Sequence, residues 1–390
     1  MRSKEKQFVR LAVFIIILSL FLTSGCISNS ENIIGELLGS FAEGIKTNPE
    51  PYSIDISELT FPTVPIQEPF SNEERPWDMS TYSPGFEVSS AYYYTQFYEN
   101  SNGIVGVRIK NLGEERVFIY KFGLFDINTD EWYGIQSGIK LLPGEEKDLG
   151  LISVDIPDNT KEVKLKLGLS ILAETPDNKW HDYDYQLFDE FTADVIQKPE
   201  KQDPEFVSNP EGTFEILNEK VDPHDIEVRK MAATSAKCYP GAYNIYQICS
   251  LFDDTKNNIQ YISDPRGTDV WSPPCDTLEV EAGDCDDYAI LLASLIESIG
   301  GTTRVYLTDT HAFAAVYIGD EENTDQIVEA IGNYYGSVPV YYTTDEYGSW
   351  LMLDPTSNVY PGGLPGGTAP IDNGWTFTNT TQVTVIDIAP

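Results

Sequence analysis

The sequence predicts a multidomain protein in which an all-β sandwich is followed by an α+β domain. Its 390 residues are 41% hydrophobic, enough for two domains of roughly 100–200 residues, each with its own core. Between residues 86 and 197, short β-rich segments alternate with turn signals, which is typical of a sandwich. From residue 216 onward, helical periodicity comes first and strand-like runs follow, which favours an α+β domain.

The charge balance limits the partners of the protein. There are 62 acidic and 25 basic side chains, and the formal net charge is −37. Because phosphate contacts require a basic surface, we expect no nucleic-acid partner. The acidity indicates a well-solvated surface, as expected of a protein exposed outside the cell.

Residues 1–25 have the pattern of a secretory signal. The first ten residues carry four basic side chains, and an apolar run from Leu11 to Leu22 leads to small residues and Cys26. Twelve helical residues rise about 18 Å, which is too short to span a bilayer core of about 30 Å. The segment resembles a lipobox, which implies cleavage before Cys26 and lipidation of its thiol. Whether the segment is cleaved or remains as an N-terminal anchor, we expect an extracytoplasmic protein held at the outer face of the cell membrane.

Residues 26–85 are expected to form a tether. A short helix is predicted over residues 31–47, and seven prolines follow between Pro49 and Pro84. Removal of residues 1–25 would leave 21 basic and 61 acidic side chains, a balance of −40. The tether would lift this acidic protein away from the membrane.

The predicted sandwich, residues 86–197, contains alternating runs such as Gly103–Ile109 and Val163–Leu169. It resembles the Ig-like spacer modules of archaeal and bacterial surface proteins. The run Asp126–Asp130 begins like a calcium-binding loop, but Glu131 stands where the loop's sharp turn requires glycine. Ser137 stands where the bidentate acid belongs, so we expect no calcium site there.

A linker is expected over residues 198–215, the α+β domain over 216–365, and a C-terminal extension over 366–390. Helices are predicted over 226–236, 242–251 and 285–299, and strands over 304–307, 311–318, 326–331, 338–342 and 350–353.

Cys285 is the candidate nucleophile. Gly283 and Asp284 precede an apolar helical run, so Cys285 falls in the first turn of the helix. Unpaired backbone N–H groups at this position favour a thiolate and can hold an oxyanion. Three acids, Asp284, Asp286 and Asp287, disfavour a thiolate, so a cationic partner is required.

His311 and Asp354 are the candidate partners of Cys285. His311 opens one predicted strand, and Asp354 ends another just before Pro355. If these strands are antiparallel neighbours, Asp354 can accept the ring N–H of His311 and fix its tautomer. Nucleophile, base and orienting acid are the groups that acyl transfer requires.

These motifs resemble the transglutaminase-like superfamily over roughly residues 225–360. The shared features are Gly-Asp-Cys285, the His311-Ala-Phe strand and the run from Trp350 to Thr356. The resemblance implies a papain-like core with Cys285 as nucleophile, His311 as general base and acid, and Asp354 as orienter. We expect the Cys285 backbone N–H to be one donor of the oxyanion hole, and Trp271 is the candidate for the second donor, which the motifs themselves do not identify.

The sequence departs from the family pattern in two places. Phe313 stands where many members have tryptophan, and a long insert lies between Asp320 and Ser349. The insert carries four tyrosines, which serve packing or contact substrate as part of a mobile loop; they are Tyr334, Tyr335, Tyr341 and Tyr342. The insert therefore leaves the substrate class open.

Each candidate also has a structural interpretation. Two disulfides could consume the four cysteines other than Cys26, which are Cys238, Cys249, Cys275 and Cys285. Cys238 and Cys249 could not pair if one continuous helix separated them by about 16 Å. A zinc site lacks the usual ligand spacing. We therefore expect no metal and no cofactor.

The function predicted from these residues is hydrolysis of peptide or isopeptide bonds in a protein or peptide substrate, the cell envelope being one source. The family also contains protein-crosslinking transglutaminases and catalytically silent relatives, and both alternatives stay open. A third alternative is that the sandwich binds a partner protein that the C-terminal domain modifies.

Overall fold

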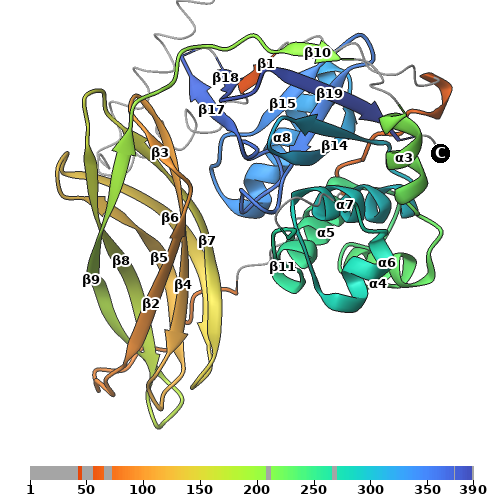
Figure 1. Ribbon diagram of the computed structural model, residues 1–390. Coiled ribbons are helices and arrows are strands. Elements are labelled where there is room, and N and C mark those ends of the chain that lie inside the picture. The colour runs from red at the N-terminus through yellow and green to blue at the C-terminus, as the bar shows by residue number, and fades with distance from the viewer. Residues whose placement is uncertain are drawn as a thin grey trace, which may run out of the picture. The chain divides into compact units, whose positions relative to one another are not determined.

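The computed structural model describes residues 43–45, 56–65, 73–207, 212–265, 270–372 and 374–388 (Figure 1). The expected signal segment, Cys26 and most of the helix predicted over 31–47 lie outside these ranges. No helix in the described ranges is long and apolar enough to cross a membrane. Residues 43–45 form a strand rather than the end of a helix, because their backbone pairs with another strand.

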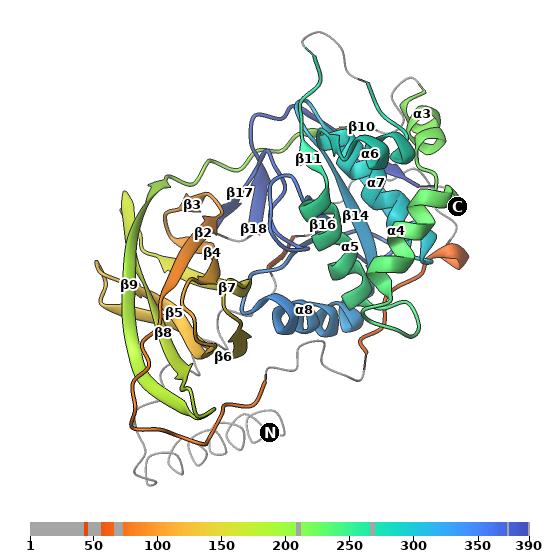
Figure 2. The ribbon, with the colours of Figure 1, turned by 90° about the horizontal axis from the view of Figure 1, so that it is seen from below.

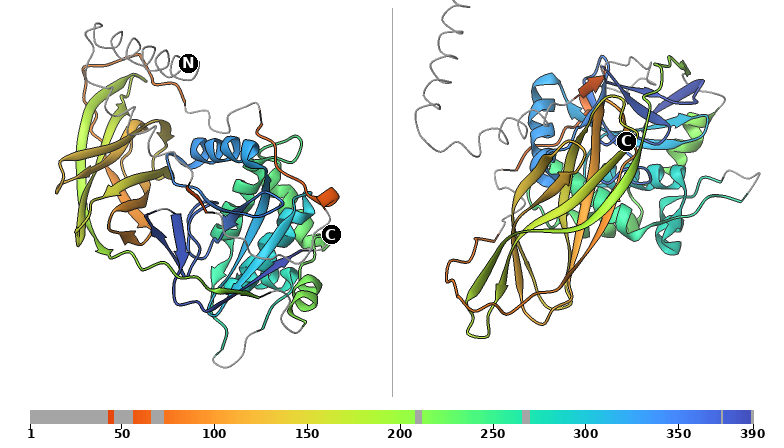
Figure 3. Two further views of the ribbon diagram at one scale, coloured as in Figure 1. Left: turned by 90° about the horizontal axis from the view of Figure 1, so that it is seen from above. Right: turned by 90° about the vertical axis from the view of Figure 1, so that its left-hand side faces the viewer.

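The first folded part is the predicted β-sandwich, which is antiparallel except for the parallel pair of β3 and β9. Its two sheets are three-stranded, in the order β2-β4-β7, and five-stranded, in the order β3-β9-β8-β5-β6. The strands are β2 Val88–Tyr94, β3 Phe97–Tyr98, β4 Ser101–Asn111, β5 Val117–Asp126, β6 Glu131–Leu141, β7 Glu146–Ile156, β8 Glu162–Glu174 and β9 Trp180–Ile196. The long, curved β9 is visible in Figure 2 and Figure 3.

The sandwich core follows from alternation along the strands. In β8, Val163, Leu165 and Leu167 are buried, whereas the lysines between them are half-buried. Their apolar side chains join those of the other sheet in one buried cluster. The run Asp126–Asp130 forms a turn in which the Asp126 carboxylate accepts the Asn128 N–H at 2.7 Å. This arrangement is an Asx turn.

The second part contains a seven-stranded sheet in the order β1-β15-β16-β14-β13-β19-β10. Its strands are β1 Glu43–Ile45, β10 Glu205–Val207, β13 Thr303–Thr308, β14 Ala312–Gly319, β15 Tyr341–Thr344, β16 Ser349–Leu353 and β19 Gln382–Asp387. Two further pairs are β11 Gln260–Tyr261 with β12 Ala282–Gly283, and β17 Thr368–Ile371 with β18 Gly374–Phe377.

The helices of this part are α3 Thr213–Lys220, α4 Ile226–Ala236, α5 Ile245–Asn258, α6 Pro274–Val280, α7 Cys285–Ser298 and α8 Glu321–Tyr335; a short 3₁₀ turn, η1, spans Ile56–Glu58. Helix α7 packs against β13 and β14, and α4, α5 and α6 pack against α7 (Figure 2). The chain is therefore a multidomain protein, rich in β-sheet.

The two faces of the seven-stranded sheet bury different side chains. Along β14, Ala314 and Val316 join the aliphatic cluster that includes the helices. Phe313 and Tyr317 alternate with them and join an aromatic cluster on the other face. Both faces are covered, so every residue of β14 is buried.

The structure corrects three predictions about this part. Residues 326–331 lie in α8 rather than in a strand, because the buried Ile327 and Ile331 recur at helical spacing. The boundary expected after residue 365 is too early, since β19 pairs with β13 inside the sheet. The linker expected over 198–215 contains β10, which pairs with β19.

The segment expected to be a tether is held by hydrogen bonds wherever the structure describes it. The Thr60 N–H donates to Thr302 Oγ1 at 3.1 Å, and the Thr63 N–H donates to the Tyr243 carbonyl at 3.0 Å. Further along, the Arg75 guanidinium lies 2.5 Å from a carboxylate oxygen of Asp182. Such specific contacts stabilise an extended segment that has no internal periodicity.

Candidate active site

Cys285 is the first residue of α7. Asp284 has extended backbone dihedrals and forms the N-cap, as the Gly-Asp-Cys motif predicts. The helix is anchored by buried Leu291, Leu292 and Leu295. Cys285 itself is half-buried. Because the first N–H groups of a helix have no partner within it, this terminus can stabilise negative charge next to the Cys285 sulfur.

His311 is held by a tight turn between β13 and β14. The Thr308 N–H donates to the His311 carbonyl at 2.8 Å, and the His311 N–H donates to Thr308 Oγ1 at 3.0 Å. The backbone of His311 is therefore fixed from both sides. The side chain is 12% exposed, so its ring is shielded from solvent at the start of the central strand β14.

Asp354 lies beside His311, at the end of the neighbouring strand, as expected from the sequence. Strands β14 and β16 are antiparallel neighbours, and Ala314 pairs with Leu353. The start of β14 therefore lies beside the end of β16. His311 Nε2 is 2.7 Å from Asp354 Oδ2. If Nε2–H donates to this carboxylate, Nδ1 is the ring nitrogen left to face Cys285.

Five hydrogen bonds converge on the Asp354 carboxylate. Besides the His311 ring, the donors are the Thr356 N–H and hydroxyl, at 3.1 and 2.6 Å, the Ser357 N–H at 3.3 Å and the Gly366 N–H at 2.7 Å. Burial alone would raise the pKa of Asp354, but hydrogen bonds from His311, Thr356 and Gly366 outweigh it and hold the pKa below its ordinary value. Asp354 is therefore an anion at neutral pH.

The same interactions favour a charged His311. Burial alone would lower the pKa of His311, but its hydrogen bonds to Asp354 and to the Cys285 side chain raise it to about 10. The imidazole therefore carries a proton at neutral pH when it lies between these two groups. His311 is therefore a candidate for the cationic partner expected for Cys285.

Gly366 covers the pair and was not identified by the sequence analysis. It belongs to the run Pro361–Gly367, which has four glycines and no helical or strand period. A Cβ atom at Gly366 would lie 2.8 Å from His311 Nε2 and 2.6 Å from Ser357 Oγ. Only glycine allows the backbone this close to the imidazole.

The acidic cluster beside Cys285 carries fewer charges than its composition suggests. Ligand oxygens of Asp284, Asp286 and Asp287 lie within 4.8 Å of one another, so the cluster could offer ligands to a cation. However, Asp287 accepts the Ser272 N–H at 2.8 Å. Burial, together with the adjacent Asp284 carboxylate, raises the pKa of Asp286 to about 10. A proton on Asp286 would relieve the repulsion without a metal. Within the described residues, Asp284 Oδ1 and Asp286 Oδ1 are buried and have no hydrogen-bond partner.

The other candidate residues occupy different environments. Trp271 is partly buried against the core that contains α7. The N–H of its neighbour Ser272 donates to Asp287 in the first turn of that helix. Tyr261 in β11 is half exposed, and burial raises the pKa of its hydroxyl. The pairing of β11 with β12 places Tyr261 beside Gly283.

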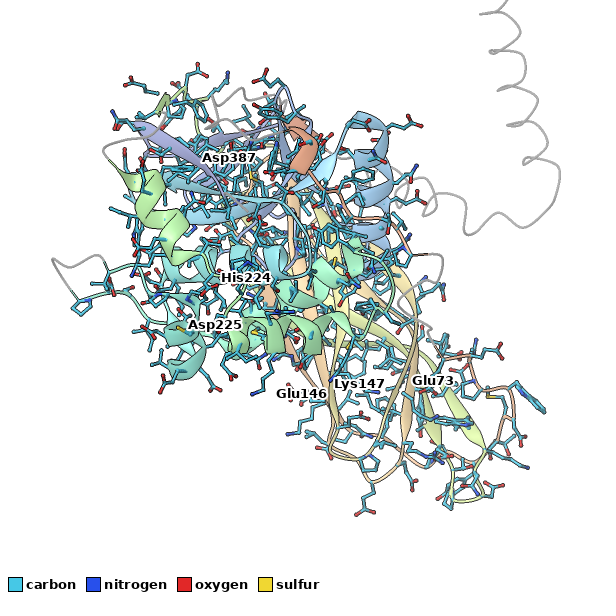
Figure 4. The ribbon with its side chains drawn as sticks, turned by 90° about the vertical axis from the view of Figure 1, so that its right-hand side faces the viewer. Glu73, Glu146, Lys147, His224, Asp225 and Asp387 are labelled. Carbon is cyan, nitrogen blue, oxygen red and sulfur yellow. The ribbon has the colours of Figure 1, made fainter. Side chains whose placement is uncertain are left out.

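None of the four cysteines in the described ranges forms a disulfide, including Cys285. The insert expected to be a mobile loop is α8 followed by β15. Its Tyr335 is buried and donates to Asp253 at 2.8 Å, which supports the packing interpretation for this tyrosine. His224 precedes α4, where Figure 4 labels it beside Asp225. His181 lies in β9 of the sandwich.

The comparisons with known proteins do not identify a family. No family model matches the chain, and no curated protein matches it in sequence. Among solved structures, the CARDB domain of a Pyrococcus furiosus protein is 16% identical, covers 30% of this chain and all of its own, and has a TM-score of 0.21. Escherichia coli alpha-2-macroglobulin is 12% identical over 55% of this chain and 33% of its own, with a TM-score of 0.20.

A candidate protease from Parabacteroides distasonis is 9% identical over 58% of this chain and 65% of its own, with a TM-score of 0.24. None of the three is described as a transglutaminase. All three TM-scores lie far below 0.5, so these similarities carry no argument about function.

Proposed function

We propose that this chain is a cysteine-dependent acyl-transfer enzyme with a transglutaminase-like domain, and that it hydrolyses peptide or isopeptide bonds. The observation that supports this proposal best is the 2.7 Å contact between His311 and Asp354, together with the effect of the Cys285 side chain on the pKa of the same imidazole. Nucleophile, base and orienting acid come from α7, the start of β14 and the end of β16.

The proposed reaction begins from the Cys285 thiolate paired with the His311 imidazolium. The thiolate attacks the amide carbonyl carbon, and the resulting oxyanion is stabilised by the Cys285 backbone N–H and by Trp271 as the second donor. The C–N bond then breaks, and imidazolium His311 protonates the leaving amine. Water attacks the thioester and gives a proton to neutral His311. The C–S bond breaks, the carboxylic acid is released, and the thiolate–imidazolium pair is restored.

Two alternative functions of the same site are protein crosslinking and binding without catalysis. If an amine replaces water at the thioester, a new amide forms and the enzyme is a transglutaminase. If Cys285 does not react, the domain is a binding or structural module. The absence of a disulfide at Cys285 favours the reactive alternatives, because an oxidised cysteine could not act as a nucleophile.

The proposal is tested by incubating the enzyme with unfolded casein and a fluorescent primary amine. New amino termini, identified by mass spectrometry, would report hydrolysis, and incorporation of the amine would report transfer. Both products should be absent with Cys285→Ala. The same products at the same rate from Cys285→Ala, or no product from the wild-type protein, would contradict the proposal.

We also propose that Cys26 becomes the lipidated first residue, so that the enzyme works at the outer face of the cell membrane. This rests on the small residues before Cys26 and the short apolar run of residues 11–22. Intact-mass measurement of the membrane-bound protein, compared with Cys26→Ala, tests it. An unmodified protein that retains residues 1–25 would contradict it.

A further inference from the structure

Lys256 lies behind the His311–Asp354 pair. It belongs to the last turn of α5 and is half-buried. Its Nζ atom donates to the carbonyl oxygen of Pro355 at 3.3 Å. Because Pro355 follows Asp354 directly, the ammonium is fixed one peptide unit away from the acid that holds His311.

The surroundings of Lys256 strengthen the interaction of its charge with the Asp354 carboxylate. Burial lowers the pKa of Lys256, whereas the carboxylates of Asp354 and Asp253 act in the opposite direction. A poorly hydrated ammonium interacts more strongly with a nearby anion than an exposed one does. Water does not compete for the Asp354 carboxylate, because this side chain is only 2% exposed.

Asp253 is the other acid that faces Lys256, from the preceding turn of α5. It accepts hydroxyl hydrogen bonds from Tyr335 at 2.8 Å and Tyr334 at 3.2 Å, both on α8. Burial raises the pKa of Asp253 to about 7. Asp253 is therefore only partly ionised at neutral pH, and Asp354 is the carboxylate that Lys256 faces in its fully charged form.

We propose that Lys256 is a positioning residue of the proposed active site, which fixes the Asp354 loop through the Pro355 carbonyl and keeps Asp354 ionised through its positive charge. This inference rests on the proposed function. An ionised Asp354 stabilises the imidazolium of His311, and the imidazolium stabilises the Cys285 thiolate. Lys256 thus acts on the nucleophile through two other residues.

Substitutions at Lys256 distinguish a residue that acts through its charge from one that only stabilises the fold. Lys256→Met keeps the aliphatic stem but removes the charge and the hydrogen bond, whereas Lys256→Arg keeps the charge and a donor. Lys256→Gln keeps a donor without the charge. Lys230→Met is the matched control, because Lys230 is an exposed lysine on α4 paired with Glu227 at 3.0 Å.

The test is a titration of the histidine rings by NMR, combined with the rate at which iodoacetamide alkylates Cys285 between pH 4 and 10. The chain has only three histidines, so His181 and His224 serve as internal references. We expect Lys256→Met and Lys256→Gln to lower the His311 titration midpoint by about one pH unit and to slow alkylation at pH 6 about tenfold. Lys256→Arg and Lys230→Met should stay close to the wild type.

The inference is overturned if folded Lys256→Met and Lys256→Gln titrate at His311 as the wild type does. Folding is checked by near-ultraviolet circular dichroism. If Lys256→Met does not fold, the His311 titration of Lys256→Gln decides the test. Failure of the proposed function has a different signature, namely a wild-type Cys285 that does not react at pH 6. The His311 titration still decides the role of Lys256 in that case.

Discussion

His311 Nε2 lies 2.7 Å from Asp354 Oδ2 although 43 residues separate the two side chains. The contact follows from topology, because β14 and β16 are antiparallel neighbours and the intervening α8 and β15 return the chain to the same sheet. Both side chains are shielded from solvent, so this contact is a buried ion pair rather than a contact between two surface groups.

Asp354→Asn should disable the site without unfolding it. The amide can accept from His311, but it carries no charge to stabilise the imidazolium. We expect loss of amide hydrolysis by about a thousandfold or more, by analogy with the acid of a serine triad. Hydrolysis assays and circular dichroism on the same preparation check this. An active Asp354→Asn would remove Asp354 from the proposed machinery, whereas Glu279→Gln, an exposed acid on α6, should have no effect.

Gly366→Ala should displace the imidazole. The added Cβ would meet His311 Nε2 at 2.8 Å and Ser357 Oγ at 2.6 Å, so the loop or the ring must move. We expect at least a tenfold loss of activity and a decrease of about 1–3 kcal/mol in the free energy of unfolding. Gly332→Ala on α8 is the control, because its Cβ would meet nothing within 4 Å. Equal behaviour of the two variants in urea unfolding and hydrolysis would contradict the role of Gly366.

The raised pKa of His311 links stability to pH. Its pKa in the folded protein is about 10 and its ordinary value is 6.5. This contribution to stability is fully present below about pH 6.5 and is lost as the pH rises through about 10. Urea unfolding at pH 6, 8 and 10 should therefore show a loss of stability that is smaller in His311→Ala. Parallel curves for the two proteins would show that His311 is not held as an imidazolium.

Asp286→Asn should leave the reactivity of Cys285 almost unchanged at pH 7. Burial and the neighbouring Asp284 raise the pKa of Asp286 to about 10, so asparagine replaces a carboxyl group that is already neutral. We expect the alkylation rate of Cys285 to change less than threefold. A large acceleration would mean that Asp286 is charged in the wild type and that three acids, rather than two, oppose the thiolate.

Arg304→Met should destabilise the seven-stranded sheet. Arg304 is fully buried, its guanidinium contacts Asp345 at 2.7 Å and Asp387 at 2.8 Å, and it lies 3.3 Å from the ring centroid of Trp350. Figure 4 labels Asp387 in β19. Removal of the cation leaves two buried carboxylates, at a cost of about 3–5 kcal/mol. Denaturant unfolding measures this, and Arg304→Met with Asp345→Asn and Asp387→Asn should recover part of the loss.

The local features of the site could be predicted from the sequence. The helix over 226–236 has the predicted bounds, and the Gly-Asp-Cys285 motif places the cysteine at the start of α7. The antiparallel pairing that joins His311 to Asp354 was expected from one strand beginning and another ending at these residues. Such features depend on neighbours in the chain, which a sequence shows directly.

Features that depend on tertiary contacts could not be predicted. Gly366 reaches Asp354 from a glycine-rich loop, and Lys256 reaches Pro355 from α5, 99 residues earlier in the chain. The short run 326–331 is rich in β-branched residues and was assigned to a strand, although it lies inside the 15-residue helix α8. Strand β19 was missed because its assignment depends on pairing with β13 rather than on its own pattern.

The most direct test of the account is the alkylation of Cys285 by iodoacetamide at pH 6, quantified by mass spectrometry in the wild type and in His311→Ala. Cys238 is an exposed cysteine of the same chain and serves as the internal reference. The account predicts that Cys285 reacts at least tenfold faster than Cys238 in the wild type and that His311→Ala abolishes this difference. A Cys285 that reacts no faster than Cys238, or whose rate does not depend on His311, would contradict it.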